Sequence, residues 1–355
     1  AHTRGYAFGT AITSGVIAGG TAGPGSTNGI SELYNGTSWS TISSPAADLT
    51  AAMYGGAGLG TVNAGLAWGS VNSGNYNAKW LEIQQFDGEA WASLSTPGLV
   101  MDKPRTGHMG SGTQNSAILI SSGYASCESE IWDGISFKSV AGATAANRSA
   151  AAGGGGNSQN DAYIAGGNLY ASPYAQSTCT EEWDGTSWSN RNSLINARSD
   201  GSLGDLGTTR AGVVFGGMAS PTVRAYTEEY TSTNTTSASF GLLEVTKLCG
   251  DGASLSDAIV ASQTFYTASS EFAPYISGSF NKGFEFSGTI LGCSPSVWSA
   301  GPNMSVARCR ASSWGTQNSA VAVGAAHADN DQKTEEYNGT SWTAGGDTSV
   351  AHTRG

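Results

Sequence analysis

The chain has 355 residues, of which 12% are charged and 51 are glycine, and its 27 acidic and 16 basic residues give a net charge of −11. This charge repels phosphate backbones and argues against a nucleic-acid partner. No apolar run reaches the roughly eighteen residues of a membrane-spanning helix, which argues against membrane insertion. The five cysteines form no CxxC pair, so we expect no zinc site. No other metal site and no cofactor are predicted, and calcium binding stays open because the Asp and Asn loops show no defined coordination pattern. A hydrophobic content of 39% is enough to build a core from short strands and tight turns.

A short hairpin motif recurs along the chain: an aromatic residue, a two-residue turn that ends in glycine, and a second aromatic residue soon after. Clear copies lie at residues 34–39, 86–91, 132–137, 183–188 and 337–342. Their Asn-Gly and Asp-Gly pairs favour type I′ turns, in which both central residues adopt positive φ. Two degenerate copies, at 230–235 and 286–291, bring the predicted number to seven, with a spacing of about 50 residues.

An apolar run that ends in small residues precedes each hairpin. In chain order these runs lie at residues 16–20, 66–69, 118–123, 163–167, 213–217, 258–262 and 320–324. Such runs are typical of strands that are buried on both faces. A further small-residue strand comes first, as at residues 4–10, so each repeat carries four strands, a to d, which is the pattern of a propeller blade.

These repeats predict a single domain, residues 1–355, with an all-β fold: a seven-bladed β-propeller of four-stranded antiparallel blades. Residues 351–355 repeat the sequence of residues 1–5, so either the chain continues into another repeat or the sequence of a ring was assigned with an overlap. We expect the ring to close through packing between its last and first blades. The predicted blades are residues 1–46, 47–96, 97–143, 144–194, 195–240, 241–302 and 303–350.

The apolar strand ending in Gly-Gly, followed by an aromatic residue and a later tryptophan, resembles the kelch repeat. The sequence Glu-Glu-Tyr-Asn-Gly-Thr-Ser-Trp at 335–342, echoed at 181–188, looks like the kelch-type repeats of virion and tail proteins in marine bacteriophages. This resemblance implies a propeller with good specificity and function only loosely, because propellers host many unrelated activities. It implies a location at the virion surface or outside the cell. The chain begins without methionine or a signal peptide, so we expect a processed chain or part of a larger polypeptide or assembly.

Two faces of the predicted ring differ in their connections. The b–c and d–a connections emerge on one face, called the loop face here, and the a–b and c–d turns emerge on the other, the turn face. Loops of variable length that carry aromatic residues commonly hold binding specificity, so we expect a ligand or partner site on the loop face, unless these side chains form a small core of their own. The candidate ligand-binding residues are Phe265, Tyr266, Phe272, Tyr275, Phe280, Phe284, Tyr170, Tyr174 and Tyr76.

A set of arginines recurs at the start of strand a and is predicted to encircle one mouth of the axial channel: Arg4, Arg105, Arg148, Arg198 and Arg308. Such a ring could bind an acidic glycan. Glutamates also recur at the start of strand c, and repeated Arg and Glu residues more often pair with each other, so we favour a structural role. These glutamates are Glu32, Glu130, Glu182, Glu229 and Glu336.

No catalytic residues are predicted. Glu181 and Glu182 are neighbours on a strand and point to opposite faces, so they cannot act as a glycosidase pair. The leading hypothesis is a non-enzymatic adhesion module, such as part of a tail fibre, that recognises a host glycan or surface protein. The alternatives are a structural virion component, a decoration or adaptor that binds another particle protein, and, third, a glycan-active enzyme.

Overall fold

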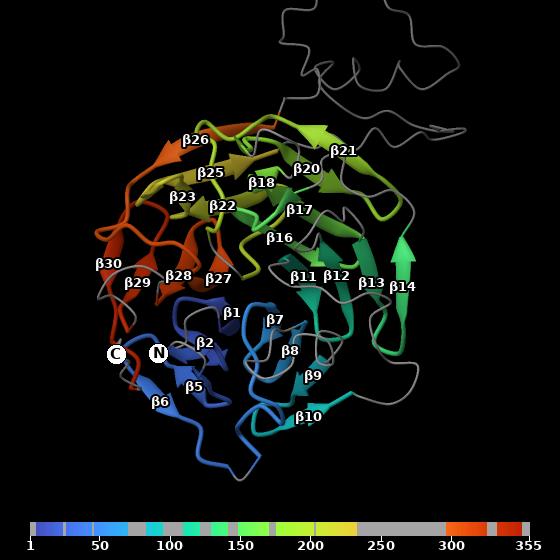
Figure 1. The fold of residues 1–355 in the computed structure, drawn as a ribbon, viewed down its shortest axis with the longest axis vertical. Coiled ribbons are helices and arrows are strands. Elements are labelled where there is room, and N and C mark those ends of the chain that lie inside the picture. The colour runs from blue at the N-terminus through green and yellow to red at the C-terminus, as the bar shows by residue number, and fades with distance from the viewer. Residues whose placement is uncertain are drawn as a thin grey trace, which may run out of the picture. The chain divides into compact units, whose positions relative to one another are not determined.

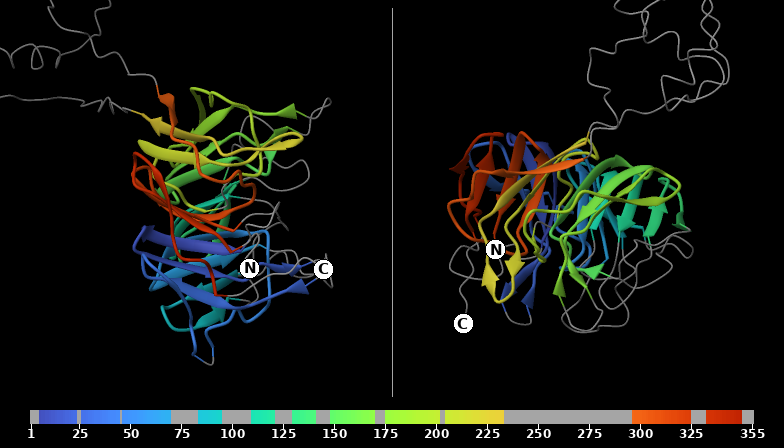
Figure 2. Two further views of the ribbon diagram at one scale, coloured as in Figure 1. Left: turned by 90° about the vertical axis from the view of Figure 1, so that its left-hand side faces the viewer. Right: turned by 90° about the horizontal axis from the view of Figure 1, so that it is seen from above.

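The computed structural model shows a ring of β-sheets whose strands are stacked outwards from a common axis (Figure 1). Seen from the side, the strands run from one face of the ring towards the other (Figure 2). The structure describes residues 5–23, 26–44, 46–69, 83–94, 109–120, 129–140, 148–169, 175–201, 204–232, 296–324 and 332–349.

Six antiparallel sheets form the blades, and strand a lies nearest the axis in the five sheets that have four strands. The first blade contains β1 (Tyr6–Ala11), β2 (Ser14–Ala18), β5 (Ser31–Tyr34) and β6 (Trp39–Thr41). The second contains β7 (Ala57–Thr61), β8 (Ala64–Trp68), β9 (Ile83–Phe86) and β10 (Trp91–Ser93). The third contains β11 (Met109–Thr113), β12 (Ser116–Ile120), β13 (Ser129–Trp132) and β14 (Phe137–Val140).

The other three blades follow the same order. The fourth contains β16 (Gly153–Ser158), β17 (Asp161–Ala165), β20 (Thr180–Trp183) and β21 (Trp188–Arg191). The fifth contains β22 (Ala211–Phe215), β25 (Thr227–Thr231) and β26 (Val297–Gly301). The sixth contains β27 (Ser312–Thr316), β28 (Ser319–Val323), β29 (Thr334–Tyr337) and β30 (Trp342–Ala344). Short strands outside the blades are β3 (Thr21–Gly23), β4 (Ser26–Thr27), β15 (Arg148–Ser149), β18 (Asn168–Leu169), β19 (Ala175–Gln176), β23 (Met218–Ala219) and β24 (Thr222–Val223).

The structure has six blades, so the prediction of seven is wrong. The error lies in residues 241–302, which were predicted to form a blade of their own. The last strand of this range, β26, instead pairs with β25 as the outer strand of the fifth blade. Trp298 therefore packs against Tyr230 with 4.9 Å between ring centroids, as Trp39 packs against Tyr34 in the first blade, also at 4.9 Å.

A long insertion separates the two halves of this fifth hairpin. Residues 233–295 lie between the paired strands β25 and β26 and outside the described residues, as do the predicted copies at 258–262 and 286–291. The entropy of closing a loop grows only by about 0.6 kcal/mol per doubling of its length, so a sheet tolerates such an insertion. Counting repeats at a fixed spacing missed it because the closing tryptophan is far from its aromatic partner in the sequence.

The c–d hairpins confirm the predicted turns but not their type. Asn35 Oδ1 accepts hydrogen bonds from the backbone N–H groups of Thr37 and Ser38, both at 2.9 Å. Among the turn residues Asn35 to Ser38, Gly36 alone adopts positive φ, at 88°, whereas a type I′ turn needs two such residues. The side chain therefore caps a four-residue loop, a role that Asn and Asp fill equally well. The same contacts recur from Asp87, Asp133, Asp184 and Asn338.

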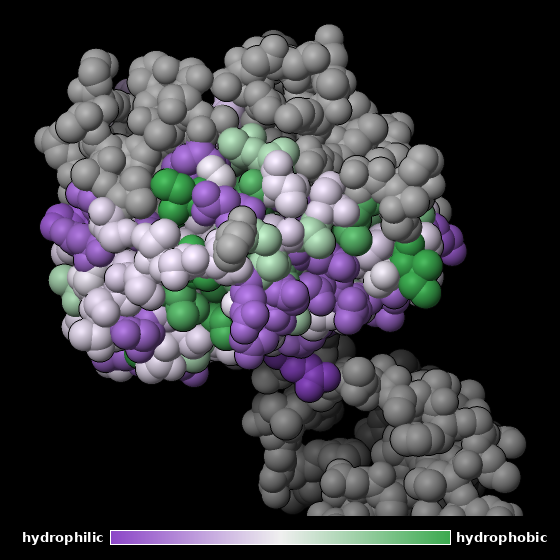
Figure 3. Space-filling view, turned by 90° about the horizontal axis from the view of Figure 1, so that it is seen from below, coloured by the Kyte–Doolittle hydropathy of each residue, from purple (hydrophilic) through white to green (hydrophobic). Residues whose placement is uncertain are grey.

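The hydrophobic core is divided among the wedges between neighbouring blades. Ile17 and Tyr34 of the first blade share one buried cluster with Trp314 and Val321 of the sixth. Gly15 lies directly beneath the Trp314 indole, where a Cβ atom would be 2.1 Å from the ring, so only glycine permits this close approach. On the side of the ring in Figure 3, the hydrophobic residues of the described part form small groups among polar ones.

Hydrogen bonds between blades repeat around the ring. The tryptophan that begins strand d donates its indole N–H, at 2.9 Å, to the hydroxyl that begins strand c in the preceding blade. The pair between the sixth and fifth blades leaves no place for another blade between them, and the pair between the first and sixth closes the ring. These pairs are Trp39 with Thr334, Trp91 with Ser31, Trp298 with Thr180, and Trp342 with Thr227.

A second repeated contact joins the fourth residue of strand c to the third residue of strand c in the preceding blade. In three junctions a tyrosine hydroxyl donates to a glutamate, and burial together with this carboxylate raises the pKa of each tyrosine. Phe86, which has no hydroxyl, instead shares a hydrophobic cluster with Leu33. At these junctions, a polar residue of one blade therefore faces a polar residue of the next, and an apolar residue faces an apolar one. The hydrogen-bonded pairs are Tyr34 with Glu336, Tyr230 with Glu182, and Tyr337 with Glu229.

The ends of the ring are joined by the same device that joins consecutive blades. In the sixth blade, Glu335 accepts a hydrogen bond of 2.8 Å from the backbone N–H of Ser305, in the connection that enters the blade. In the first blade, Glu32 accepts the equivalent bond, also 2.8 Å, from Ser349 near the other end of the chain. Closure therefore uses specific hydrogen bonds in addition to the expected packing.

Candidate functional site: the axial pocket

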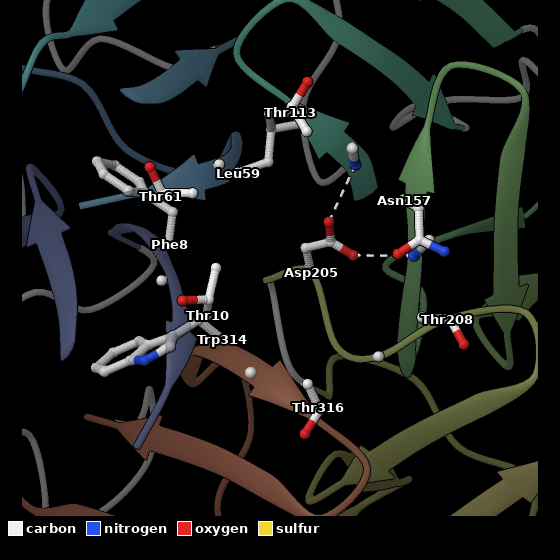
Figure 4. Close-up of a pocket in the computed structure, with 16 residues that line it drawn as sticks. Phe8, Thr10, Leu59, Thr61, Thr113, Asn157, Asp205, Thr208, Trp314 and Thr316 are labelled. Carbon is white, nitrogen blue, oxygen red and sulfur yellow. Dashed lines mark hydrogen bonds between the residues drawn. The ribbon is translucent and has the colours of Figure 1, made fainter. Parts of the chain in front are cut away.

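A pocket opens on the axis of the ring, on the turn face. Each blade contributes the end of its innermost strand, and there the sequence reads Gly-Thr in five blades and Gly-Asn in the fourth (Figure 4). The pocket has a volume of about 190 Å³. Phe8, Leu59 and Trp314 also lie beside the pocket, but they are almost completely buried. The polar ring consists of Thr10, Thr61, Thr113, Asn157, Thr208 and Thr316.

The fifth blade contributes differently from the others, because its innermost segment contacts several blades across the axis. Gly204 forms a parallel bridge with Gly58 of the second blade, and Leu206 forms one with Gly315 of the sixth. The Leu206 N–H also donates to the carbonyl of Gly154 in the fourth blade, at 3.0 Å. Of this segment, residues 204–206, Asp205 lines the pocket.

Asp205 is the central residue of this segment, and its carboxylate points into the ring (Figure 4). Its two oxygens accept backbone N–H groups of Gly112 and Gly156, each at 3.0 Å. Although part of its surface meets the pocket, dense surrounding protein desolvates the carboxylate and raises its pKa to about 8, against the lowering effect of these hydrogen bonds.

The electrostatic surroundings of Asp205 are negative. The carboxylate of Asp161 adds a smaller upward contribution to the Asp205 pKa. Asp161 is itself held by the hydroxyl of Thr209 at 2.6 Å and by the amide of Asn157 at 3.0 Å. Among the described residues that line the pocket, none is lysine, arginine or histidine.

The arginines of the predicted ring are buried where the structure describes them. Each pairs with the second residue of strand c and donates through Nη1 to backbone carbonyls that flank the b–c connection. Arg4 and Arg105 lie outside the described residues. The buried pairs are Arg148 with Glu181, Arg198 with Glu228, and Arg308 with Glu335.

The second blade replaces this ion pair with an uncharged one. Met53 occupies the arginine position, since its carbonyl accepts the N–H of Gly20 as that of Arg308 accepts the N–H of Gly217. Gln84 takes the place of the glutamate, with its Nε2 atom 3.4 Å from the Met53 sulfur. In these blades, the residue at the arginine position and the residue at the glutamate position are thus either both charged or both uncharged.

The glutamates predicted to face the arginines occupy two different positions. Glu32 and Glu130 are second residues of strand c, whereas Glu182, Glu229 and Glu336 are third residues and accept the tyrosine hydroxyls of the next blade. Consistent with this alternation, Glu181 faces Arg148 and its neighbour Glu182 faces Tyr230.

The predicted aromatic ligand-binding residues all lie outside the described residues. The chain leaves the ring after β25 and returns at β26, so residues 233–295 connect strand c to strand d of the fifth blade. At the point of departure, the Ser232 N–H donates to the carbonyl of Arg210 in an a–b turn. The remaining candidates, Tyr76, Tyr170 and Tyr174, belong to b–c connections.

Sequence reasoning missed the axial pocket. Its signal was present in the Gly-Thr pairs at residues 9–10, 60–61, 112–113, 207–208 and 315–316, which recur at the end of strand a. Asp205 stands two residues before its Gly-Thr pair, where the other blades have glycine, alanine or serine. An acidic residue at a position otherwise occupied by small residues marks the axis.

Within the described part of the chain, no group of three or more His, Cys, Asp or Glu side chains could hold a metal ion, and no helix could cross a membrane. Compared with known proteins, the sequence matches no family model, and no curated protein sequence is significantly similar to it.

Proposed function

We propose that this chain is a non-enzymatic binding module, displayed on a virion or cell surface, that recognises a glycan or a surface protein. The observation that carries the proposal is the axial pocket, which is lined by threonine or asparagine residues from all six blades. Side chains of this kind donate and accept hydrogen bonds in several directions, which suits the hydroxyl groups of a sugar.

The kelch-like repeat sequence and its resemblance to bacteriophage tail proteins support the location on a virion or cell surface. The aromatic-rich insertion supports a second contact, since aromatic side chains stack on sugars and anchor protein partners. Both the pocket and the ends of the insertion, Ser232 and Ser296, belong to the turn face. We therefore propose that the ring itself binds through its turn face, where the pocket opens.

The insertion also favours a second candidate, a structural virion component whose insertion holds a neighbouring particle protein. Stoichiometric retention in particles, without affinity for any glycan, would support this alternative.

The test is binding of the purified chain to a panel of glycans and host-surface proteins. A variant with residues 265–284 replaced by a short Gly-Ser loop is measured in parallel, and circular dichroism confirms that the ring remains folded. Loss of binding in the variant assigns recognition to the insertion, whereas retained binding assigns it to the ring. If the wild-type chain binds no member of the panel, the adhesion proposal is abandoned.

A further inference from the structure

The innermost segment of the fifth blade, residues 204–206, leaves its own blade. In the sixth blade, β27 and β28 pair at five consecutive positions. The described part of the fifth blade keeps such pairing only beside its a–b turn, where Gly207 faces Gly212. The same register would set Leu206 against Val213, but Leu206 forms its bridge with the sixth blade instead.

The displaced segment lies on the axis of the ring. Its backbone partners Gly58, Gly154 and Gly315 belong to the second, fourth and sixth blades, which alternate around the ring. A short segment reaches three alternate blades at once only from the axis. The approach is close, because a Cβ atom on Gly155 would be 2.5 Å from the carbonyl oxygen of Leu206. Glycine in the inner strands thus leaves room for the segment.

The side chain of Tyr163, in the fourth blade, stands where the segment has left its own blade. Its buried hydroxyl donates to the carbonyl of Leu206 at 2.6 Å and lies 3.4 Å from the carbonyl of Val213. Regular pairing would join these two residues by hydrogen bonds, because the pair two positions away, Thr208 with Ala211, exchanges both of its backbone bonds. The phenol therefore occupies the position of a missing strand contact.

The aromatic ring at this position is specific to the fourth blade. Tyr163 is the third residue of strand b, and its ring packs over Gly212, where a Cβ atom would be 2.5 Å from the phenol oxygen. The third residue of strand b is aliphatic in the other blades: Val16, Leu66, Ile118, Val213 and Val321. The one tyrosine thus faces the one blade whose strand a is displaced.

We infer that Tyr163 is a positioning residue that keeps residues 204–206 on the axis, and that an aliphatic residue in its place lets the segment return to β22 as a regular strand a. The fold then holds one segment with two discrete arrangements, and Tyr163 selects between them. Because Asp205 lines the axial pocket, this selection also sets the shape of that pocket. The inference does not depend on what the ring binds.

Disulfide formation reports which arrangement is present. In a regular strand pair, positions 205 and 214 face each other without hydrogen bonds, with Cα atoms roughly 4.5 Å apart, which suits a disulfide. Asp205→Cys and Val214→Cys are introduced together, with Tyr163 retained and with Tyr163→Val. After mild oxidation, peptide mass spectrometry measures the linked fraction. We expect this fraction to be at least fivefold higher with Tyr163→Val, and the loss of Asp205 is common to both chains.

The controls separate the aromatic ring from other effects. Ala7→Cys with Ile17→Cys, a regular pair at the corresponding position of the first blade, should link equally in both backgrounds. Tyr163→Phe keeps the ring without its hydroxyl and should link positions 205 and 214 as little as tyrosine does. Tyr163→Leu, which copies the second blade, replaces Tyr163→Val if that variant does not fold.

Two results would overturn the inference. Linkage of positions 205 and 214 as strong as that of the control pair, with Tyr163 retained, would mean that the segment already pairs within its blade. Equally weak linkage with tyrosine and with a folded aliphatic variant would mean that Tyr163 does not hold the segment on the axis. If neither aliphatic variant folds, the first of these results still decides.

Discussion

Asp205 also makes the stability of the ring depend on pH in an unusual direction. Most native carboxylates have lowered pKa values and destabilise a protein when acid protonates them. Burial raises the pKa of Asp205 to about 8 from an ordinary 3.8. Between these values the native state holds a proton that the unfolded state has lost, so the contribution of Asp205 to stability is complete at acidic pH and is lost as pH rises through about 8.

The size of the effect follows from the pKa difference. About four units at about 1.4 kcal/mol each set an upper limit of about 5 kcal/mol for ionising Asp205 in the folded ring. The pocket admits water to part of the carboxyl group, so we expect about half of this. From pH 5 to pH 8 the wild-type chain should therefore lose about 2 kcal/mol of unfolding free energy relative to Asp205→Asn. The variant should also carry a pH-independent cost of about 1–2 kcal/mol, since an amide oxygen cannot accept both N–H groups.

Urea unfolding followed by tryptophan fluorescence at pH 5, 6, 7 and 8 measures this difference directly. The control is Asp184→Asn, because backbone N–H groups lower the pKa of this exposed turn carboxylate and it is ionised throughout the range. Parallel stability curves for Asp205→Asn and the wild type would refute the reasoning, because they would mean that Asp205 does not change its protonation in this interval.

Three further results are expected. Arg308→Met should lower the unfolding free energy by about 3–5 kcal/mol, because Glu335 is left buried without its cation. Adding Glu335→Gln should restore much of this loss, because the double variant copies the uncharged Met53–Gln84 pair of the second blade. Thermal unfolding measures both variants, and a double variant that is no more stable than Arg308→Met would contradict this explanation. Tyr337→Phe should cost about 1.5–3 kcal/mol through the lost bond to Glu229, and a double-mutant cycle with Glu229→Leu should give a coupling energy above about 1 kcal/mol, whereas additive losses would argue against a direct contact. Replacing residues 233–295 with a short Asn-Gly turn should leave a folded ring with little change in Tm, and loss of the β-sheet circular dichroism signal would show that the ring needs the insertion.

Local patterns in the sequence predicted the repeat unit correctly. The number of blades depends on long-range strand pairing, which these patterns do not show. The turn motifs and apolar runs identified every blade that has four consecutive strands. The fifth blade escaped because Tyr230 and Trp298, which pack together, are separated by the insertion. No spacing rule reveals that β26 returns to β25, because this pairing is a property of the folded sheet.

The site shows the same division. The sequence displays the Gly-Thr pairs and the single aspartate among small residues, but their convergence on one axis appears only when the ring is closed. Recurrence suggested that the arginines pair with glutamates, but the described arginines pair with Glu181, Glu228 and Glu335, each the neighbour of a predicted glutamate. Which glutamate each arginine meets depends on the alternation of strand c, where Glu181 and Glu182 face opposite wedges.

The matched contacts between blades also bear on how the chain finds its order during folding. All blades share one backbone plan, so a blade could dock against the wrong neighbour with little geometric penalty. A misplaced sixth blade next to the third would set the Tyr337 hydroxyl against Ile131, and a misplaced second blade next to the fifth would set Phe86 against Glu229. Either error buries a polar group without its partner at a cost of about 1–3 kcal/mol. The differences between repeats at these contact positions thus favour the native order of the blades over other orders.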